Sequence, residues 1–223
     1  MAIVDNPILT DNQKALLARL AVSRLREAFY LAGGTALSAF YLQHRLSEDL
    51  DFFTAGDFAI EDVLDFVKSL PGAQNSHYER KYDRRIFLLN YANGQTMKVE
   101  FTRYPFARLN AGPVIDGIRV DSLEDILVNK LMAMTDRTDP KDYVDLYCAC
   151  RDHPELNLDK LVDATAIKFG VQGARLILSG RFLQPLPPSG VLAMRRPLDK
   201  EDMAQFYLHH AKSWIERSKD TLG

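Results

Sequence analysis

The stretch of this sequence that decides the fold is residues 33–53, GGTALSAFYLQHRLSEDLDFF. A glycine pair opens a helical pattern, and Asp49 and Asp51 then stand two positions apart in an apolar run. Because side chains alternate between the two faces of a strand, we expect Asp49 and Asp51 on one face and Leu50 and Phe52 on the other. The stretch therefore predicts a turn into a helix, followed by a strand that carries paired carboxylates.

Paired carboxylates that point the same way suit a hard divalent cation. Mg²⁺ prefers oxygen ligands and bridges a few carboxylates to the phosphates of a substrate, and Mn²⁺ can take its place. A glycine-flanked helix N-terminus beside such a pair would offer backbone N–H groups and the positive end of the helix dipole to those phosphates. The two features together predict a site that handles nucleotides.

Length and composition set bounds on this interpretation. The chain has 223 residues, of which 47% are hydrophobic and 26% charged, so it can bury a sizeable core as one fused unit or as two small domains. The formal net charge is −2, which is no overall basic signature. Nucleic-acid binding would therefore depend on a local basic patch.

Cysteine usage and hydropathy predict the compartment. Cys148 and Cys150 lie two positions apart in a helical pattern, where such side chains diverge, so neither a disulfide nor a zinc pair is expected. The first residues lack a basic stretch followed by a long apolar one, and no later run reaches the length of a membrane span. We expect a soluble cytoplasmic protein that makes no membrane contact.

Hydrophobic periodicity predicts an α+β fold, with a mixed sheet and flanking helices in the N-terminal half and a helical bundle after it. Asp11 is the expected N-cap of the first helix. The predicted strands are residues 29–32, 50–54, 77–82, 86–91, 96–102 and 115–120, and the helices among them are residues 12–28, 35–44 and 60–67. The predicted helices of the C-terminal half are residues 123–134, 140–151, 158–168, 172–179 and 199–218.

Two charged residues, Lys130 and Asp145, lie at helix positions that the helical pattern does not explain. Lys130 lies on the apolar stripe of the predicted helix 123–134, where burying an unpaired ammonium would be costly. It is either a ligand for phosphate or a lysine at the margin of the stripe that reaches water through its stem. In the next helix Asp142 and Asp145 share a face. The helix dipole explains Asp142, an acid of the first turn, better than Asp145, which lies further in.

Four motifs between residues 33 and 147 carry a family resemblance. They are GGTAL at 33–37, RLSEDLDFF at 45–53, NKLMA at 129–133 and R-x-x-x-K-D-Y-V-D-L-Y at 137–147. Together they resemble the AbiEii/AbiGii-type nucleotidyltransferase toxins, a branch of the polymerase-β-like nucleotidyltransferase superfamily associated with phage abortive infection and toxin–antitoxin pairs. The resemblance implies a nucleotidyltransferase-like α/β core over residues 1–121 and a helical domain over residues 122–223 that completes the active site.

The resemblance also implies which residues bind the nucleotide. Gly33, Gly34 and Thr35 look like the phosphate-binding turn, because glycines let the backbone approach a triphosphate closely. Ser47 occupies a familiar place near this turn, with a role that the motif leaves open. Lys130 resembles the motif lysine that neutralises charge on the triphosphate.

The same resemblance implies the catalytic and metal-binding residues. Asp49 and Asp51 look like the catalytic D-x-D that holds Mg²⁺ against a nucleoside triphosphate, with Lys130 and Asp145 as further catalytic residues. Asp145 would hold the lysine or help position the acceptor. Superfamily members often carry a third carboxylate on a neighbouring strand, and the candidate here is Glu100. It would complete the metal site, unless it belongs to a solvated strand face.

The sequence leaves the acceptor open. The resemblance implies transfer to tRNA ends or binding of a nucleoside triphosphate, and RNA would need basic residues near the site. Two basic clusters could serve or could be ordinary solvated charge: Arg80, Lys81, Arg84 and Arg85, and Arg195 and Arg196.

Three functions follow. The first is a toxin that moves a nucleoside monophosphate to tRNA or another macromolecule and is paired with a cognate antitoxin. The second is transfer to a small hydroxylated molecule, and the third is a binding module that partners another protein without chemistry. The intact D-x-D argues against the third.

Overall fold

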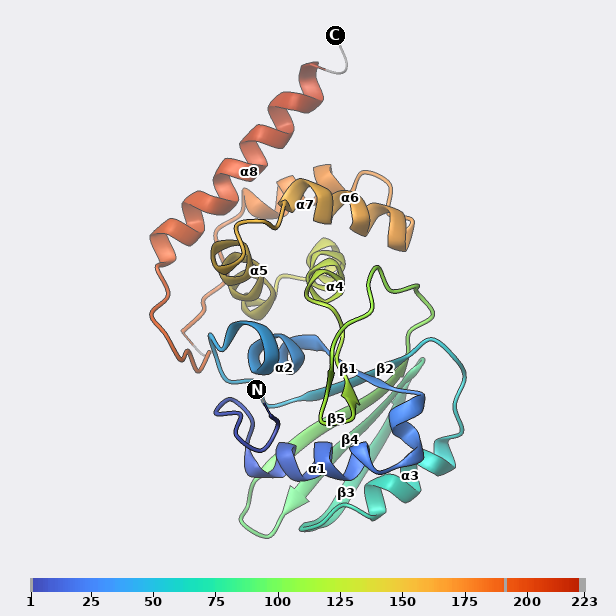
Figure 1. Cartoon of the computed structure of the whole chain (residues 1–223). Helices are drawn as coiled ribbons and strands as arrows, with labels where there is room; N and C mark the ends of the chain where they lie inside the picture. Colours follow the sequence, from blue (N-terminus) through green and yellow to red (C-terminus); the bar gives the residue numbers. More distant parts are fainter. Residues whose placement is uncertain (1, 191, 221–223) are drawn as a thin grey trace. The chain divides into compact units, whose positions relative to one another are not determined.

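The computed structural model of the chain describes residues 2–190 and 192–220 (Figure 1). It divides into two compact units, Met1–Leu123 and Glu124–Gly223. The first unit contains a five-stranded mixed sheet with helices, and the second is a run of helices, so the predicted α+β class is confirmed.

The sheet of the first unit has the strand order β1-β2-β5-β4-β3. Its strands are β1 (Tyr30–Ala32), β2 (Leu50–Thr54), β3 (Ala73–Lys81), β4 (Arg84–Tyr91) and β5 (Thr96–Arg103). β2 and β5 run parallel, whereas every other neighbouring pair is antiparallel. The parallel pair places two strands that are far apart in sequence side by side at the centre of the sheet.

One face of the sheet forms the hydrophobic core of this unit. Phe52 of β2 and Phe101 of β5 are register partners, both are fully buried, and their rings stack with centroids 5.1 Å apart. Phe66 of α3 (Ile60–Lys68) packs edge-on against Phe101. Helix α1 (Asp11–Ala21) lies on the same side of the sheet (Figure 1). The alternating residues of β2 and β5 consequently point to the opposite face.

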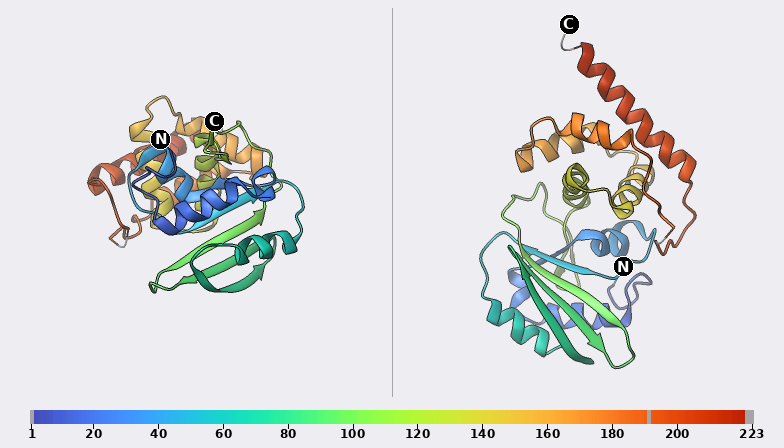
Figure 2. Two further views of the ribbon diagram at one scale, coloured as in Figure 1. Left: turned by 60° about the horizontal axis from the view of Figure 1, so that its bottom comes forward. Right: turned by 180° about the vertical axis from the view of Figure 1, so that it is seen from behind.

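The opposite face of β5, β4 and β3 is open. Seen from behind in the right-hand view of Figure 2, these three strands have no described helix of the first unit over them. Side-chain exposure agrees, because Leu88 of β4 is 41% exposed and nearly all residues of β3 are exposed. Of the acids predicted to form the site on this face, Asp49 and Asp51 are half-buried and Glu100 is buried, so the alternative of a solvated strand face for Glu100 is wrong.

Three predictions for the N-terminal helices are wrong in detail. The predicted helix 12–28 ends at Ala21, and a separate 3₁₀ turn, η1, covers Arg24–Glu27. The N-cap of α1 is Thr10 rather than Asp11, because the Thr10 hydroxyl and the Gln13 side chain form a reciprocal capping box. The predicted helix 35–44 is a short α-helix, α2 (Gly33–Leu37), continued by a π-helical turn, η2 (Ser38–Leu42).

The predicted strand 115–120 is also wrong. The segment is a small hairpin of β6 (Val114–Ile115) and β7 (Ile118–Arg119). It turns at Asp116 and Gly117, whose φ angles are +48° and +83°. Aspartate followed by glycine favours this left-handed backbone, which is why one continuous strand does not form.

The second unit is built from five helices within its described residues. They are α4 (Leu123–Asp136), α5 (Pro140–Asp152), α6 (Leu158–Phe169), α7 (Ala174–Phe182) and α8 (Lys200–Asp220). Trp214 and Tyr207 of α8 are buried, and both rings contact Phe182 of α7. No helix in the described part of the chain is long and apolar enough to cross a membrane.

Candidate functional site

Three carboxylates meet on the open face of the sheet. Asp51 of β2 is the register partner of Glu100 on the parallel strand β5, so the two side chains are neighbours on one face. Asp49 lies just before β2, and its Oδ2 atom is 2.8 Å from Nζ of Lys98. Lys98 stands two residues before Glu100 on β5. The alternation of strand residues thus brings Asp49, Asp51 and Glu100 together.

Two of these acids have cationic partners. Lys98 pairs with Asp49, and Arg84 of β4 binds Glu100 through both carboxylate oxygens. The Thr102 hydroxyl also donates to Glu100, at 2.7 Å. The charges of Asp49 and Glu100 are therefore largely compensated within the protein.

Asp51 differs from Asp49 and Glu100 because it has no cationic partner among the described residues. It is half-buried, and it forms no hydrogen bond or ion pair with any residue that the structure describes. Burial, together with the negative charges of Glu100 and Asp49, raises the pKa of Asp51 to about 6, against the opposing effect of Lys98 and Arg84. A half-buried anion beside two other acids would be stabilised by a cation bound to it.

The donor set fits a hard cation in part. Carboxylate oxygens are the ligands that Mg²⁺ prefers, and it usually takes one or two carboxylates together with phosphate oxygens and water. The described residues contain no group of three His, Cys, Asp or Glu side chains arranged to hold a metal ion. Arg84 instead binds both oxygens of Glu100. Asp49 and Asp51 are thus the pair that would hold the ion, and Glu100 as a third ligand stays a prediction.

The glycine at the start of α2 fits against Asp51. Gly33 has a φ of +70°, and a Cβ atom built on it would overlap Oδ2 of Asp51. Any side chain at this position would be strained in the backbone and would collide with the carboxylate. The bend at residues 33–34 therefore lies beside the second aspartate of the D-x-D segment.

The other residues of the turn have structural neighbours. The buried Thr35 hydroxyl donates to the backbone carbonyl of Asp49, so it ties α2 to the segment that carries the acids. A Cβ on Gly34 would lie 2.8 Å from the guanidinium of Arg45 and 3.2 Å from Oγ of Ser47. Gly34 therefore lies close to both of these side chains.

Three cations of this site are not part of the predicted acid site. They are Lys98, Arg84 and Arg45, of which Arg84 is predicted only as a member of a basic cluster that could serve RNA. A signal for Lys98 is present in the sequence, because it shares the alternation of Glu100 on β5. Arg84 depends on the β4–β5 register, which pairs it with Thr102 and brings it to Glu100. No local pattern reveals that register.

In the second unit, Lys130 is buried between two aspartates. Its Nζ atom lies 2.6 Å from Asp145 and 3.0 Å from Asp142. Arg137 adds a second cation to Asp142 at 2.9 Å. The helix-dipole explanation of Asp142 is therefore incomplete, because this acid shares an ion-pair network with Lys130 and Asp145.

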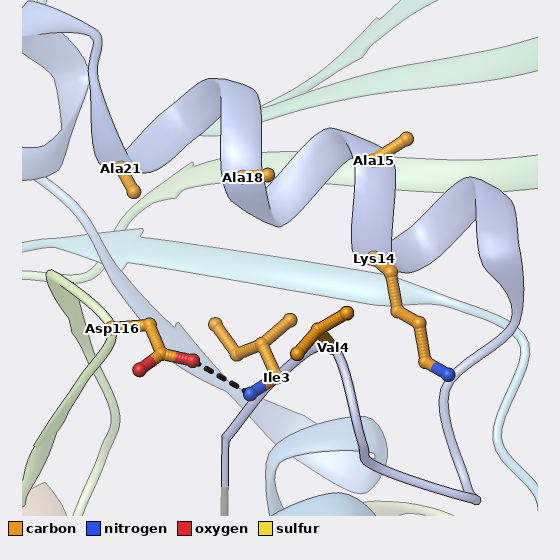
Figure 3. A pocket seen from close by; sticks show the side chains of 7 residues that line it. All are labelled: Ile3, Val4, Lys14, Ala15, Ala18, Ala21 and Asp116. Carbon is orange, nitrogen blue, oxygen red and sulfur yellow. Dashed lines mark hydrogen bonds between the residues drawn. The ribbon is translucent and has the colours of Figure 1, made fainter.

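A pocket of the first unit contains none of the predicted site residues. It has a volume of about 470 Å³ and lies between the N-terminal segment and α1 (Figure 3). The Ile3 N–H donates to the Asp116 carboxylate at its edge. The residues that line it are Ile3, Val4, Lys14, Ala15, Ala18, Ala21 and Asp116. This mostly apolar lining does not suit a polyphosphate.

The motifs and the fold agree with one known family over most of the chain. The family described as Nucleotidyl transferase AbiEii toxin, Type IV TA system, matches residues 15–216. The chain belongs to the AbiEii family of nucleotidyltransferase toxins. The resemblance inferred from the motifs is confirmed, and this AbiEii chain is a nucleotidyltransferase toxin of a type IV toxin–antitoxin system, with a nucleoside triphosphate as the substrate that the family implies.

Individual relatives share a third of their residues or fewer with this chain over the aligned region. Uncharacterized protein aq_aa25 of Aquifex aeolicus (strain VF5) is 33% identical over 152 residues, which cover 65% of this chain and 68% of that protein. A candidate nucleotidyltransferase from H. pylori is 22% identical, with a TM-score of 0.60 over 93% of each chain. JHP933 from Helicobacter pylori is also 22% identical, with a TM-score of 0.59 over 94% of this chain and 92% of that one. The two solved structures show the shared fold alone.

Substitution of Gly33 should test the contact between the AbiEii glycine turn and the acid. Gly33→Ala and Gly94→Ala both place alanine at a left-handed φ, +70° and +78°, but only the first meets a carboxylate, because Gly94 faces open space. We expect Gly33→Ala to lower the free energy of unfolding by about 1–3 kcal/mol more than Gly94→Ala. Urea denaturation at pH 7 measures both. Equal losses would show that the Asp51 carboxylate moves aside freely.

Substitution of Asp51 should change the pH dependence of stability. The folded-state pKa is about 6 and the ordinary value 3.8, so the folded protein binds the extra proton between these values and loses stability as the pH rises through them. Asp51→Asn removes that loss. Its Tm should match that of the wild type near pH 4 and exceed it at pH 7.5, by about 2–4 °C for each kcal/mol of repulsion removed. A Tm difference that does not change with pH would contradict this assignment.

Proposed function

We propose that this AbiEii toxin transfers a nucleoside monophosphate from a nucleoside triphosphate to a hydroxyl group of tRNA, with Mg²⁺ held by Asp49 and Asp51. The observation that carries the proposal is the half-buried Asp51 carboxylate, which lies against Gly33 and has no partner among the described residues. Asp49 and Asp51 would hold a divalent cation, which would supply positive charge against the charge that develops on the leaving group. Mn²⁺ would serve in the same place.

The transfer needs one bond made and one broken. The acceptor hydroxyl attacks the α-phosphorus, the bond to the bridging β-phosphate oxygen breaks, and pyrophosphate leaves. The proton of the hydroxyl passes to a carboxylate of the acid cluster. Glu100 is the acid of the cluster that does not hold the cation in this proposal, so it is the candidate acceptor of the proton. Arg84 and Thr102 hold its carboxylate in place.

The turn residues would bind and position the triphosphate. Gly33 and Gly34 have no side chain to block the approach of phosphate to their backbone N–H groups, and the Ser47 hydroxyl lies beside Gly34. Thr35 would act as a positioning residue, because its hydroxyl is engaged by the carbonyl of Asp49.

The helical domain, residues 122–223, would complete the active site through Lys130. An ammonium group held by Asp142 and Asp145 has a fixed position, from which it would contact the triphosphate. Asp145 would then hold the lysine rather than touch the substrate.

The acceptor and the partner are proposed from the same family. A toxin of a type IV system implies a cognate antitoxin, and tRNA is a cytoplasmic acceptor that offers a terminal hydroxyl. We therefore expect the protein to act in the cytoplasm. The alternatives are transfer to a small hydroxylated molecule and a nucleotide-binding partner protein without chemistry.

A labelling experiment separates these functions. The full chain is incubated with each labelled triphosphate, Mg²⁺, and either total RNA or a small-molecule extract. We expect label on tRNA, and a loss of about 10²–10³-fold in Asp51→Asn. Asp57→Asn is the matched control, because Asp57 is an acid of the same unit whose side chain is 92% exposed. Label on a small acceptor, or none with any triphosphate, would reject the proposal.

Lys130 needs a charge-balanced test. Lys130→Gln alone leaves two buried aspartates without their shared cation and should cost about 3–5 kcal/mol of stability. Lys130→Gln combined with Asp145→Asn removes one charge of each sign and leaves Asp142 with Arg137. We expect this double variant to fold, with a rise of roughly tenfold or more in KM for the triphosphate. Wild-type kinetics in the double variant would make the Lys130 network purely structural.

A further inference from the structure

Like charges face each other at the end of the β3–β4 hairpin. We call residues 80–85 the hairpin tip. The strand register pairs Arg80 with Arg85 and Lys81 with Arg84. Like charges directly opposite each other destabilise a sheet, so the fold gains nothing from this arrangement.

The four cations differ in what surrounds them. Arg84 binds Glu100, and Arg85 lies 5.7 Å over the ring of Phe58 and donates to a backbone carbonyl. Arg80 and Lys81 are exposed and form no ion pair with any residue in the described part of the chain. These two cations are therefore available to a ligand.

Two acids also belong to this surface. Glu79 and Asp83 are both exposed and stand beside the cations in sequence. Four cations against these two acids and Glu100, which Arg84 binds, leave one excess positive charge at this end of the hairpin, in a chain whose formal net charge is −2.

The backbone of Tyr82 is strained at the same turn. It is the first residue of a two-residue hairpin loop and has a φ of +54°, a conformation that favours glycine and is uncommon for a bulky side chain. Its side chain is 86% exposed, more than any other large hydrophobic side chain in the described part of the chain. Strain kept at a position that contributes little packing points to function.

The hairpin tip is connected to the acid site. Arg84 belongs to the tip and binds Glu100, which is the register neighbour of Asp51. β4 lies two strand spacings, roughly 10 Å, from β2 in the sheet. Lys81 shares the open face with its register partner Arg84, whereas Arg80 and Arg85 lie on the other face of the hairpin. Within the first unit, a ligand held by Lys81 would reach toward Asp51 along the open face.

We infer that the hairpin tip binds the RNA acceptor. Arg80 and Lys81 contact its phosphates, and the ring of Tyr82 stacks on an unpaired base close to the nucleotide that receives the transfer. This assignment rests on the proposed function and adds the surface that positions its acceptor.

RNA fits this surface better than a protein partner does. A polyanion relieves the repulsion between facing cations, and an exposed aromatic ring beside them stacks on any base. A protein interface of useful size would need a larger area with aromatic anchors in pockets, whereas the Tyr82 ring projects from a turn. The positive tip would also counter the repulsion between RNA phosphates and the three carboxylates.

The test measures RNA binding without chemistry. Fluorescence anisotropy of labelled tRNA with the full chain, in the absence of triphosphate, gives Kd and its dependence on salt. Tyr82→Gly should weaken binding about 5- to 150-fold while leaving Tm unchanged or raised, because glycine adopts the positive φ without strain. Tyr82→Phe, which keeps the ring, should bind within about twofold of the wild type.

The charge variants carry their own control. Arg80→Gln with Lys81→Gln should reduce the slope of log Kd against log salt by about 1.4 to 1.8. Arg24→Gln with Lys68→Gln removes two exposed cations elsewhere in the same unit and should leave the slope unchanged. KM for the triphosphate should stay at its wild-type value in every tip variant.

The results separate this inference from the proposed function. If the wild type labels tRNA but Tyr82→Gly binds tRNA as tightly as the wild type does, the inference fails and the proposed function stands. If tRNA binding depends on the tip and no label is transferred, the inference stands and the proposed function fails. Equal losses in the tip pair and the control pair would also overturn the inference, because they would show only general charge attraction.

Discussion

The contact between the Asp51 carboxylate and Gly33 fixes the geometry of everything around it. Strands β1 and β2 pair so that Ala32 is opposite Asp51, which brings the next residue, Gly33, over the carboxylate. The close approach is compatible only with a residue that has no Cβ and accepts a φ of +70°. The glycine turn and the D-x-D segment are thus one packing unit, although α2 and its π-helical continuation separate them in sequence.

The surrounding cations explain how a sheet tolerates three acids in one place. Lys98 compensates Asp49 and Arg84 compensates Glu100, so the repulsion that remains is concentrated on Asp51. Strand geometry decides this distribution, because residues two apart on β5 share a face and β4 supplies the next side chain across the sheet. The sheet therefore compensates two of its three acids internally, and the charge of Asp51 is left without an ion pair among the described residues.

Residue types and periodicity are enough to predict the acids. They do not predict which side chains pair with one another in the folded chain. The two-residue strand period places Asp49 and Asp51 together, and the helical period places Lys130 on an inward face. That two aspartates share Lys130 depends on how α4 packs against α5, which no local pattern encodes. The hairpin at 116–117 is different, because its Asp-Gly signal is present in the sequence and the apolar residues on either side outweigh it in the prediction.

With the RNA acceptor that we propose, this nucleotidyltransferase would have to hold two polyanions beside a cluster of acids, and a chain with a formal net charge of −2 cannot do so by its overall field. Single cations close to the acids would have to bind these polyanions instead. Arg84 is one such cation, because it neutralises Glu100 and also belongs to the basic tip of the hairpin. Because Arg84 is placed there, it faces Lys81 across the hairpin, and the two cations repel each other. A hairpin selected for stability alone would have no reason to keep both cations and a strained tyrosine at one turn.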